Sequence, residues 1–282
     1  MKSTLTFLEN RTLWSIVRWG ILIAAITIAL FPYFWMLRLS VSGADSVALN
    51  GLEFLPNSWD FSNFARAWEE ANLGRAMLNG AIVTLTILIF QLVTCIPAAY
   101  AFAKIPFRGR NVAFALVIGC LLVPTQANAM PLYLGMGFVG LGNTMTALIL
   151  PFVSSAFGIF LLRQHMLTIP DALLEAARMD GLGTFSTLWR VVIPASLPSI
   201  ATFSIFSIFV HWNDYLWPLL IARSTELHTP PLALAVFQDV QAGQDFGALA
   251  AGALIITAPI VLLYLLAQRS FERGFSGGEI PG

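Results

Sequence analysis

The sequence predicts an all-α integral membrane protein with six transmembrane helices and both termini in the cytoplasm. Three observations indicate this class. Hydrophobic residues make up 57% of the 282 residues and charged residues only 11%, whereas a soluble domain carries roughly 25% charged residues. Six apolar runs each have about the 20 residues that a helix needs to cross a bilayer. The basic residues gather in alternate loops, which indicates a defined orientation.

The six predicted spans are long apolar runs that lack the short-period alternation of barrel strands. We place them at about Trp19–Leu37, Asn79–Phe102, Asn111–Met130, Thr144–Leu162, Ser199–Ile221 and Gly247–Gln268. The first run resembles a signal peptide, but it is longer than a usual signal sequence and no A-x-A site follows it. We therefore expect one membrane domain over residues 19–268, between an N-terminal tail (1–18) and a C-terminal tail (269–282).

The positive-inside rule orients these spans. The tails and two loops on one predicted side hold Lys2, Arg11, Arg18, Lys104, Arg108, Arg110, Arg163, Arg178, Arg190, Arg269 and Arg273. The other side holds Arg38, Arg66, Arg75 and Arg223. The excess places both tails and the loop between the fourth and fifth spans in the cytoplasm, which agrees with an even number of spans.

A polar hairpin, residues 165–198, lies between the fourth and fifth predicted spans. Thr168 is expected to N-cap a first helix, and Gly181 lies where a left-handed C-cap would end it. Thr184 is then expected to cap a second helix that runs to Val192, and Pro194 is expected to break the chain before the fifth span. On the residues alone, an ordinary interfacial hairpin and an element that docks to a partner explain this pattern about equally well.

The hairpin carries a motif that reads Glu175-Ala176-Ala177, three residues, Gly181, nine residues, and then Val191-x-Ile193-Pro194. This pattern resembles the cytoplasmic signature of permease subunits of ABC importers, with Val191 and Ile193 in place of the commoner Ile and Leu. The small side chains of Ala176 and Ala177 are expected to form a shallow patch that another surface can approach closely.

Further segments resemble the sugar-importer branch of these permeases, the maltose-transporter type. They are Asp180-Gly181 in the signature, Trp212-Asn213-Asp214-Tyr215 with Pro218 in the fifth span, and Gln268-Arg269-Ser270-Phe271 with Gly274 in the tail. The resemblance covers nearly the whole chain. The tail departs from the branch because it ends at Gly282 without the usual terminal Lys-Gly pair.

The resemblance implies a type I ABC importer fold in a bacterial or archaeal inner membrane. It implies a second homologous permease subunit, two ATP-binding subunits that hold ATP and Mg, and an extracytoplasmic solute-binding protein as partners. It also implies that the chain forms half of the pathway for a sugar or sugar-like solute. By this resemblance the residues that couple to the ATPase are Glu175, Ala176, Ala177, Asp180 and Gly181.

Polar residues within the predicted spans are candidates for lining that pathway, since polar groups in lipid usually face a cavity or another helix. They are Gln126 and Asn128 in the third span and Trp212, Asn213, Asp214 and Tyr215 in the fifth. In one interpretation Trp212 or Tyr215 stacks on a sugar ring. In the other, which we favour for Asp214, Asn213 and Asp214 cap a broken helix before Pro218.

Several functions are not indicated. The chain lacks the G-x-x-x-x-G-K-[ST] loop and the intramembrane motifs of proteases and acyl transferases, so we expect no catalytic site and no cofactor in this chain. Its histidines are far apart and its cysteines lie in spans, so we expect no metal site. Zero net charge gives no basic field for nucleic acid. The alternative is a self-sufficient secondary transporter or channel for a small polar solute, although Asp214 is the one acidic residue in a predicted span.

Overall fold

The computed structural model describes residues 2–43, 54–56, 58–238 and 245–276. Within these residues the regular structure is helical, apart from an isolated bridge between Ser42 and Trp59, which confirms the predicted all-α class. The chain divides into two compact units, residues 1–71 with 236–255 and residues 72–235 with 256–282. Each is described by itself.

The first unit contains α1 (Lys2–Ser40), α3 (Ser62–Glu70) and the beginning of α15 (Phe246–Ser276). Asn63 is fully buried and ties α3 to the end of α1, because its amide nitrogen donates to the carbonyls of Ser40 (3.0 Å) and Ser42 (2.9 Å). Arg66 donates to the Asn63 side chain and forms an ion pair with Asp245.

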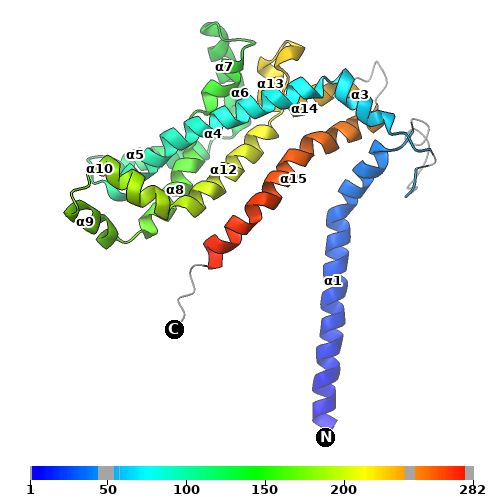
Figure 1. Ribbon diagram of the computed structural model, residues 1–282, viewed down its shortest axis with the longest axis horizontal. Coiled ribbons are helices and arrows are strands. Elements are labelled where there is room, and N and C mark those ends of the chain that lie inside the picture. Colours follow the sequence, from blue (N-terminus) through cyan, green and yellow to red (C-terminus); the bar gives the residue numbers. More distant parts are fainter. Residues whose placement is uncertain (1, 44–53, 57, 239–244, 277–282) are drawn as a thin grey trace. The chain divides into compact units, whose positions relative to one another are not determined.

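The second unit is built on α4, a helix of 32 residues. Its helices are α4 (Leu73–Lys104), α5 (Arg110–Leu121), α6 (Thr125–Phe138), α7 (Met145–Ile149), η1 (Leu150–Phe152), α8 (Ala156–Thr168), α9 (Asp171–Met179), α10 (Thr184–Thr187), η2 (Leu188–Val192), α11 (Ile193–Ala195), α12 (Leu197–Trp212), α13 (Leu216–Ile221), η3 (Thr225–Leu227), α14 (Pro230–Ala233) and η4 (Leu234–Gln238), with η4 continuing into the first unit. Helices α8 and α12 lie alongside α4 (Figure 1).

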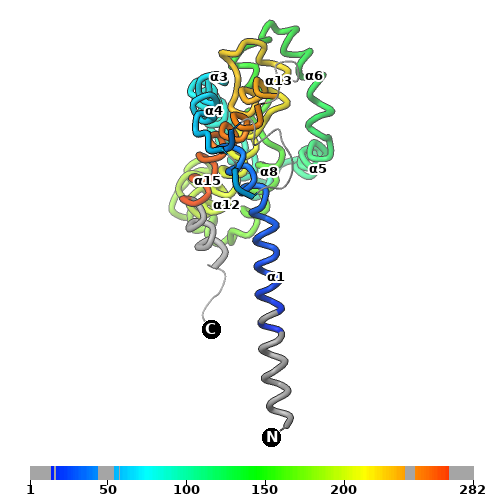
Figure 2. Tube along the Cα trace, turned by 90° about the vertical axis from the view of Figure 1, so that its right-hand side faces the viewer, coloured from blue at the N-terminus to red at the C-terminus, as the bar shows by residue number. Residues whose placement is uncertain are grey.

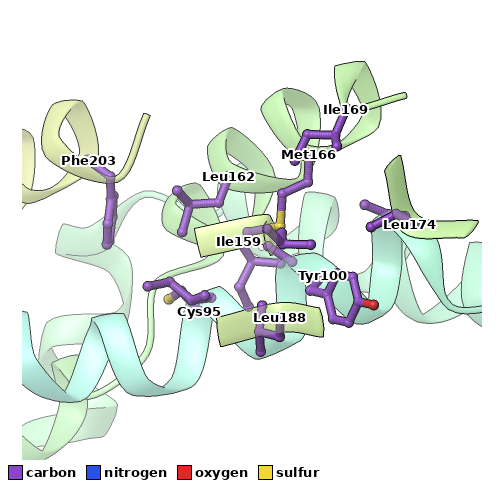
Figure 3. Packing of buried hydrophobic residues seen from close by; sticks show 13 residues of the cluster. Cys95, Tyr100, Ile159, Leu162, Met166, Ile169, Leu174, Leu188 and Phe203 are labelled. Atoms are coloured by element: carbon purple, nitrogen blue, oxygen red, sulfur yellow. The ribbon is translucent and has the colours of Figure 1, made fainter. Parts of the chain in front are cut away.

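The core of this unit lies where α4, α8 and α12 meet the polar hairpin. Figure 3 shows Cys95 and Tyr100 of α4 facing Ile159, Leu162 and Met166 of α8. Leu174 of α9, Leu188 of η2 and Phe203 of α12 belong to the same cluster. The hairpin is therefore packed onto the ends of α4 and α8 through apolar contacts, and these contacts fix the positions of its exposed residues.

Four segments are long and apolar enough to cross a membrane: Val17–Ser40, Leu73–Lys104, Met145–Thr168 and Phe246–Leu266. Two further helix pairs reach span length only if each bent pair is counted as one, so the count is between four and six among the described residues. The third predicted span, Asn111–Met130, is not one straight helix. It bends by 97° between α5 and α6, just before Pro124 (Figure 2).

Two other predicted spans are interrupted inside their apolar runs. Within Met145–Thr168 the helix breaks after η1, and Ser155 caps the new helix by accepting from the Gly158 N–H at 3.1 Å. Within the predicted span Ser199–Ile221 the helix breaks between Trp212 and Leu216. The break in the fifth span agrees with the interpretation that Asn213 and Asp214 cap a broken helix before Pro218. The break in the fourth span was not predicted, because hydropathy does not depend on backbone geometry.

Candidate functional site

Helix α9 carries the first part of the motif, and its start differs from the prediction. Thr168 is the last residue of α8, and its hydroxyl donates to the His165 carbonyl at 2.7 Å, so it does not cap α9. The N-cap position is Pro170, whose side chain makes no capping bond. Asp171 is the first residue of α9, where a negative charge favours the positive end of the helix dipole.

The end of α9 is as predicted. Gly181 has φ +79°, in the left-handed region that glycine adopts without strain. The Gly181 N–H donates to the Arg178 carbonyl (2.9 Å) and the Leu182 N–H to the Ala177 carbonyl (3.0 Å), which is the bonding pattern of a Schellman motif. A Cβ at Gly181 would meet nothing within 4 Å, so glycine is favoured there by backbone conformation and not by crowding.

The second arm of the hairpin corrects two predictions. Thr184 is the first helical residue, and Gly183 holds the N-cap position without a side-chain bond. Pro194 does not break the chain, because α10, η2 and α11 continue to Ala195 and the sharp bend of 78° falls at Ser196, before α12. The first turn of a helix accepts proline, and Pro194 has that position in α11.

The exposed face of the hairpin is partly apolar. Helix α9 buries Leu174 and Ala177 and exposes Glu175, Ala176 and Asp180. The expected patch of two alanines is therefore wrong in one residue, because Ala177 faces inward. The hairpin also leaves apolar side chains exposed: Met179 of α9 by 88%, Phe185 of α10 by 71% and Trp189 of η2 by 58%. Exposed apolar side chains beside a polar motif are typical of an interface.

The fifth-span candidates make a capped helix break, the interpretation favoured for Asp214. The Asp214 carboxylate accepts from the Trp217 N–H at 3.3 Å, and the Asn213 amide donates to the Phe209 carbonyl at 2.8 Å. Trp212 is buried, and its indole N–H donates to the Ile256 carbonyl at 2.9 Å, which leaves no open ring face for a sugar in this conformation. Tyr215 remains 40% exposed.

We expect Asp214→Ala to destabilise the chain by about 0.5–2 kcal/mol, the usual cost of a lost N-cap. The measurement is thermal unfolding of the purified chain in detergent. The matched control is Glu70→Ala, which removes an exposed carboxylate at the end of α3 and should leave the unfolding free energy within about 0.5 kcal/mol. A change of solute preference at unchanged stability would contradict the capping role of Asp214.

The third-span candidates, Gln126 and Asn128, lie exposed at the start of α6. Residues that were not predicted line a hollow of about 350 Å³ beside α6 and α13, with Tyr133 and Arg223 among them. The Arg223 guanidinium donates to the Tyr133 hydroxyl at 2.6 Å. The sequence predicts Arg223 only as an outer-loop charge, and Tyr133 lies just beyond the predicted third span, so the sequence gives no signal for the hollow.

A buried polar cluster around Gln91 was also missed. Gln91 is 3% exposed, and its amide nitrogen contacts the Phe152 carbonyl (2.9 Å) and His211 Nε2 (3.2 Å). Its amide oxygen accepts from the Ser207 hydroxyl at 2.7 Å. Thr94 adds a bond to the Val153 carbonyl at 2.9 Å. Side chains of α4 thus satisfy carbonyls freed by the break in the fourth span, as lipid requires. A glutamine in the apolar run 79–102 was the available signal.

No group of three or more histidine, cysteine or acidic residues suited to a metal ion occurs within the described residues. Four to six helical segments long and apolar enough to cross a membrane, joined by a capped polar hairpin, define a multi-pass integral membrane protein. The chain belongs to the family described as the binding-protein-dependent transport system inner membrane component, whose model matches residues 91–277.

Relatives of known name agree with this family. The chain is 32% identical to a probable ABC transporter permease protein of Bacillus subtilis, covering 94% of this chain and 88% of that protein. It is 31% identical to the arabinooligosaccharides transport system permease protein of Halalkalibacterium halodurans, covering 90% and 92%. A crystal structure of a bacterial ABC transporter that imports the acidic polysaccharide alginate contains a chain with TM-score 0.80 and 25% identity, covering 92% and 96%. The resemblance to ABC importer permeases is therefore confirmed.

Proposed function

We propose that this chain is a permease subunit of an ATP-driven importer, that it forms half of the translocation pathway, and that separate ATPase subunits drive it through the polar hairpin. The observation that carries the proposal is the exposed, Schellman-capped α9 with Glu175, Ala176 and Met179 on its open face, in a chain of the binding-protein-dependent family. A short capped helix can be gripped and displaced as a rigid body. The residues proposed to contact the ATPase are Glu175, Ala176, Asp180 and Gly181, while Ala177, the fifth predicted coupling residue, is buried and holds α9 against the core.

The proposed topology has six spans, three of them made of bent or broken helices, with both termini and the hairpin in the cytoplasm of a bacterial or archaeal inner membrane. The distribution of basic residues supports this orientation. The proposed assembly adds a second permease subunit, two ATP-binding subunits that hold ATP and Mg, and an extracytoplasmic solute-binding protein. The family's description as binding-protein-dependent supports the last of these partners.

The proposed solute is a sugar or sugar-like compound. Named relatives act on arabinooligosaccharides and on alginate, so the chemistry they share is that of a carbohydrate chain. For the pathway we propose Gln126, Asn128, Asn213 and Tyr215, whose side chains are exposed in this conformation. Asp214 and Trp212 are assigned to holding the break in the fifth span, in keeping with their hydrogen bonds.

The hairpin's role is tested by Gly181→Pro and Glu175→Lys in the chain assembled with its partner permease and ATPase subunits. Proline cannot adopt φ +79° and has no N–H for the Arg178 carbonyl. Lysine reverses the charge of an exposed residue without touching the core. We expect both variants to assemble in the membrane but to lose at least about 90% of solute uptake. The reason is that losing a coupling free energy of typical size between two sites weakens the coupled step about tenfold.

The matched control is Gly181→Asn, because asparagine tolerates the left-handed region and nothing lies near the site. It should retain most uptake. Uptake of a radiolabelled arabino-oligosaccharide panel into proteoliposomes, with ATP hydrolysis measured in parallel, gives the ratio of transport to hydrolysis. Normal ratios in both test variants would refute the coupling role, and uptake by this chain alone would refute the importer assignment.

A further inference from the structure

A buried lysine joins α9 to the end of α4. The Lys104 side chain is 7% exposed, and its ammonium donates to the Ile169 carbonyl at 2.6 Å and to the Asp171 carboxylate at 2.7 Å. Lys104 is the last residue of α4, Ile169 is the C-cap of α8 and Asp171 is the first residue of α9. One ammonium therefore connects three helices at the point where the chain enters the hairpin.

A second bond runs in the opposite direction between the same helices. Arg163 of α8 donates from Nε to the Phe102 carbonyl in the last turn of α4 at 3.2 Å, and its guanidinium lies 3.9 Å from the centre of the Phe114 ring. The Phe102 carbonyl of α4 thus accepts a hydrogen bond from Arg163 of α8, and the Lys104 ammonium of α4 donates hydrogen bonds at the junction of α8 and α9. We call these two bonding sets the α4–α9 clasp.

The burial of the Lys104 ammonium determines what the clasp does. A charge taken out of water is destabilising unless it is paired and hydrogen-bonded. The Asp171 carboxylate is 77% exposed, so it screens the ammonium from one side while the Ile169 carbonyl binds it from the other. The hydrogen bond from Lys104 and its positive charge lower the pKa of Asp171 below the ordinary 3.8. The pair is therefore fully formed at neutral pH and is lost only as the pH falls through that lowered pKa.

The clasp is reinforced beneath by the apolar core. Leu174 of α9 is 4% exposed and belongs to the same cluster as Tyr100 and Ala103 of α4 (Figure 3). Helix α9 is therefore held to α4 at its first residue by charge and hydrogen bonds, and one turn later by buried apolar contacts. Such an arrangement transmits displacement without bending at the junction.

The other end of α4 is tied to a different segment. The Asn79 amide donates to the carbonyls of Glu226 (2.8 Å) and His228 (3.0 Å). A Cβ at Gly80 would lie 2.6 and 2.8 Å from atoms of the Pro230 ring, so the two segments are in close contact. Because α4 has 32 residues, its length is about 48 Å, and it connects the hairpin with the segment 226–230.

We propose that Lys104 is a positioning residue that makes α9 and α4 move as one body, so that a displacement of the exposed face of α9 is carried along α4 to the segment 226–230. This inference rests on the proposed coupling function of the hairpin. It assigns to Lys104 a role outside the motif, which begins 71 residues further along the chain, at Glu175.

The test is Lys104→Met in the full transporter, with spin labels at Leu173→Cys in α9 and Val93→Cys in α4. Both positions are exposed, at 45% and 66%, and neither belongs to the face of α9 proposed to contact the ATPase. Because Cys120 is exposed and would also be labelled, it is replaced by serine, whereas Cys95 is buried and is left in place. With Lys104 present, the distance between the labels should be the same without nucleotide and after trapping with ATP and vanadate. In Lys104→Met the distance should shift or broaden on trapping, and uptake should fall about tenfold while ATP hydrolysis continues.

Two further variants make the result specific. Lys104→Arg should restore most uptake, because arginine keeps a charged donor of similar reach. Arg108→Met removes the same charge from the adjoining loop and should behave like the parent, which separates the clasp from an effect on membrane orientation. If Lys104→Met does not accumulate, Asp171→Ala opens the exposed half of the clasp and should lower uptake about two- to fivefold, the range of a partly exposed ion pair.

The outcomes separate the two proposals. If Glu175→Lys and Gly181→Pro uncouple transport while Lys104→Met keeps a constant label distance and normal uptake, the inference about Lys104 is wrong and the hairpin's role stands. If the hairpin variants transport normally, the proposed function itself fails. Normal uptake in Asp171→Ala, where Lys104→Met cannot be measured, would likewise overturn the clasp.

Discussion

Gln91→Met is expected to destabilise the chain by about 2–5 kcal/mol, because it removes three hydrogen bonds inside the membrane. Methionine has nearly the volume of glutamine, so the loss comes from polarity and not from a cavity. The Phe152 carbonyl, the Ser207 hydroxyl and His211 Nε2 would each lose the partner that Gln91 gives them. The first of these belongs to the interrupted fourth span, where the carbonyl has no helical partner of its own.

The measurement is thermal or SDS-induced unfolding of the purified chain, together with its accumulation in the membrane. Gln126→Met is the matched control, since it makes the same chemical change at an exposed position of α6 and should leave the unfolding free energy within about 0.5 kcal/mol. Equal stabilities of the two variants would show that the Gln91 cluster does not hold the break in the fourth span.

Gly158→Ala is expected to lower the unfolding free energy by about 1–3 kcal/mol through overpacking. A Cβ at this position of α8 would lie 2.5 and 2.6 Å from atoms of the Phe203 ring and 3.2 Å from Cys95 Sγ. The ring cannot move aside freely, because Phe203 is 1% exposed within the core cluster. The glycine thus sets the closest approach of α4, α8 and α12.

The control is Gly135→Ala in α6, where a Cβ meets nothing within 4 Å. Alanine is the better helix former, so this variant should gain about 0.5–1 kcal/mol. Opposite signs for the same substitution in two helices would establish crowding as the cause at Gly158. The double variant Gly158→Ala with Phe203→Leu should recover part of the loss, and failure to recover any would point away from the Phe203 contact.

The sequence predicted what depends on local composition and backbone preference. Among the described residues, four of the six apolar runs located segments long enough to cross a membrane. Gly181 located the end of α9, because the Schellman motif there needs a residue in the left-handed region. Both signals act over a few neighbouring residues and need no tertiary partner.

The predictions that failed depended on contacts distant in the sequence. Thr168 has the residue type of an N-cap, but α8 extends through it and Lys104, 65 residues before Ile169, satisfies the end of α8 instead. The break in the fourth span depends on Gln91 and Thr94, which lie about 60 residues earlier. Ala177 faces inward because Leu174 fixes the buried side of α9. Side-chain to backbone bonds of this kind leave no periodic pattern in the sequence.

The two attachments of α4 limit changes in the length of this helix among related sequences. Asn79 bonds one segment and Lys104 another, with a continuous helix between them. One residue inserted or deleted between them would rotate one end by about 100° and shift it by about 1.5 Å relative to the other, so that only one attachment could form. Insertions and deletions should therefore be excluded from residues 79–104, even where the lipid-facing side chains in that stretch can be exchanged freely.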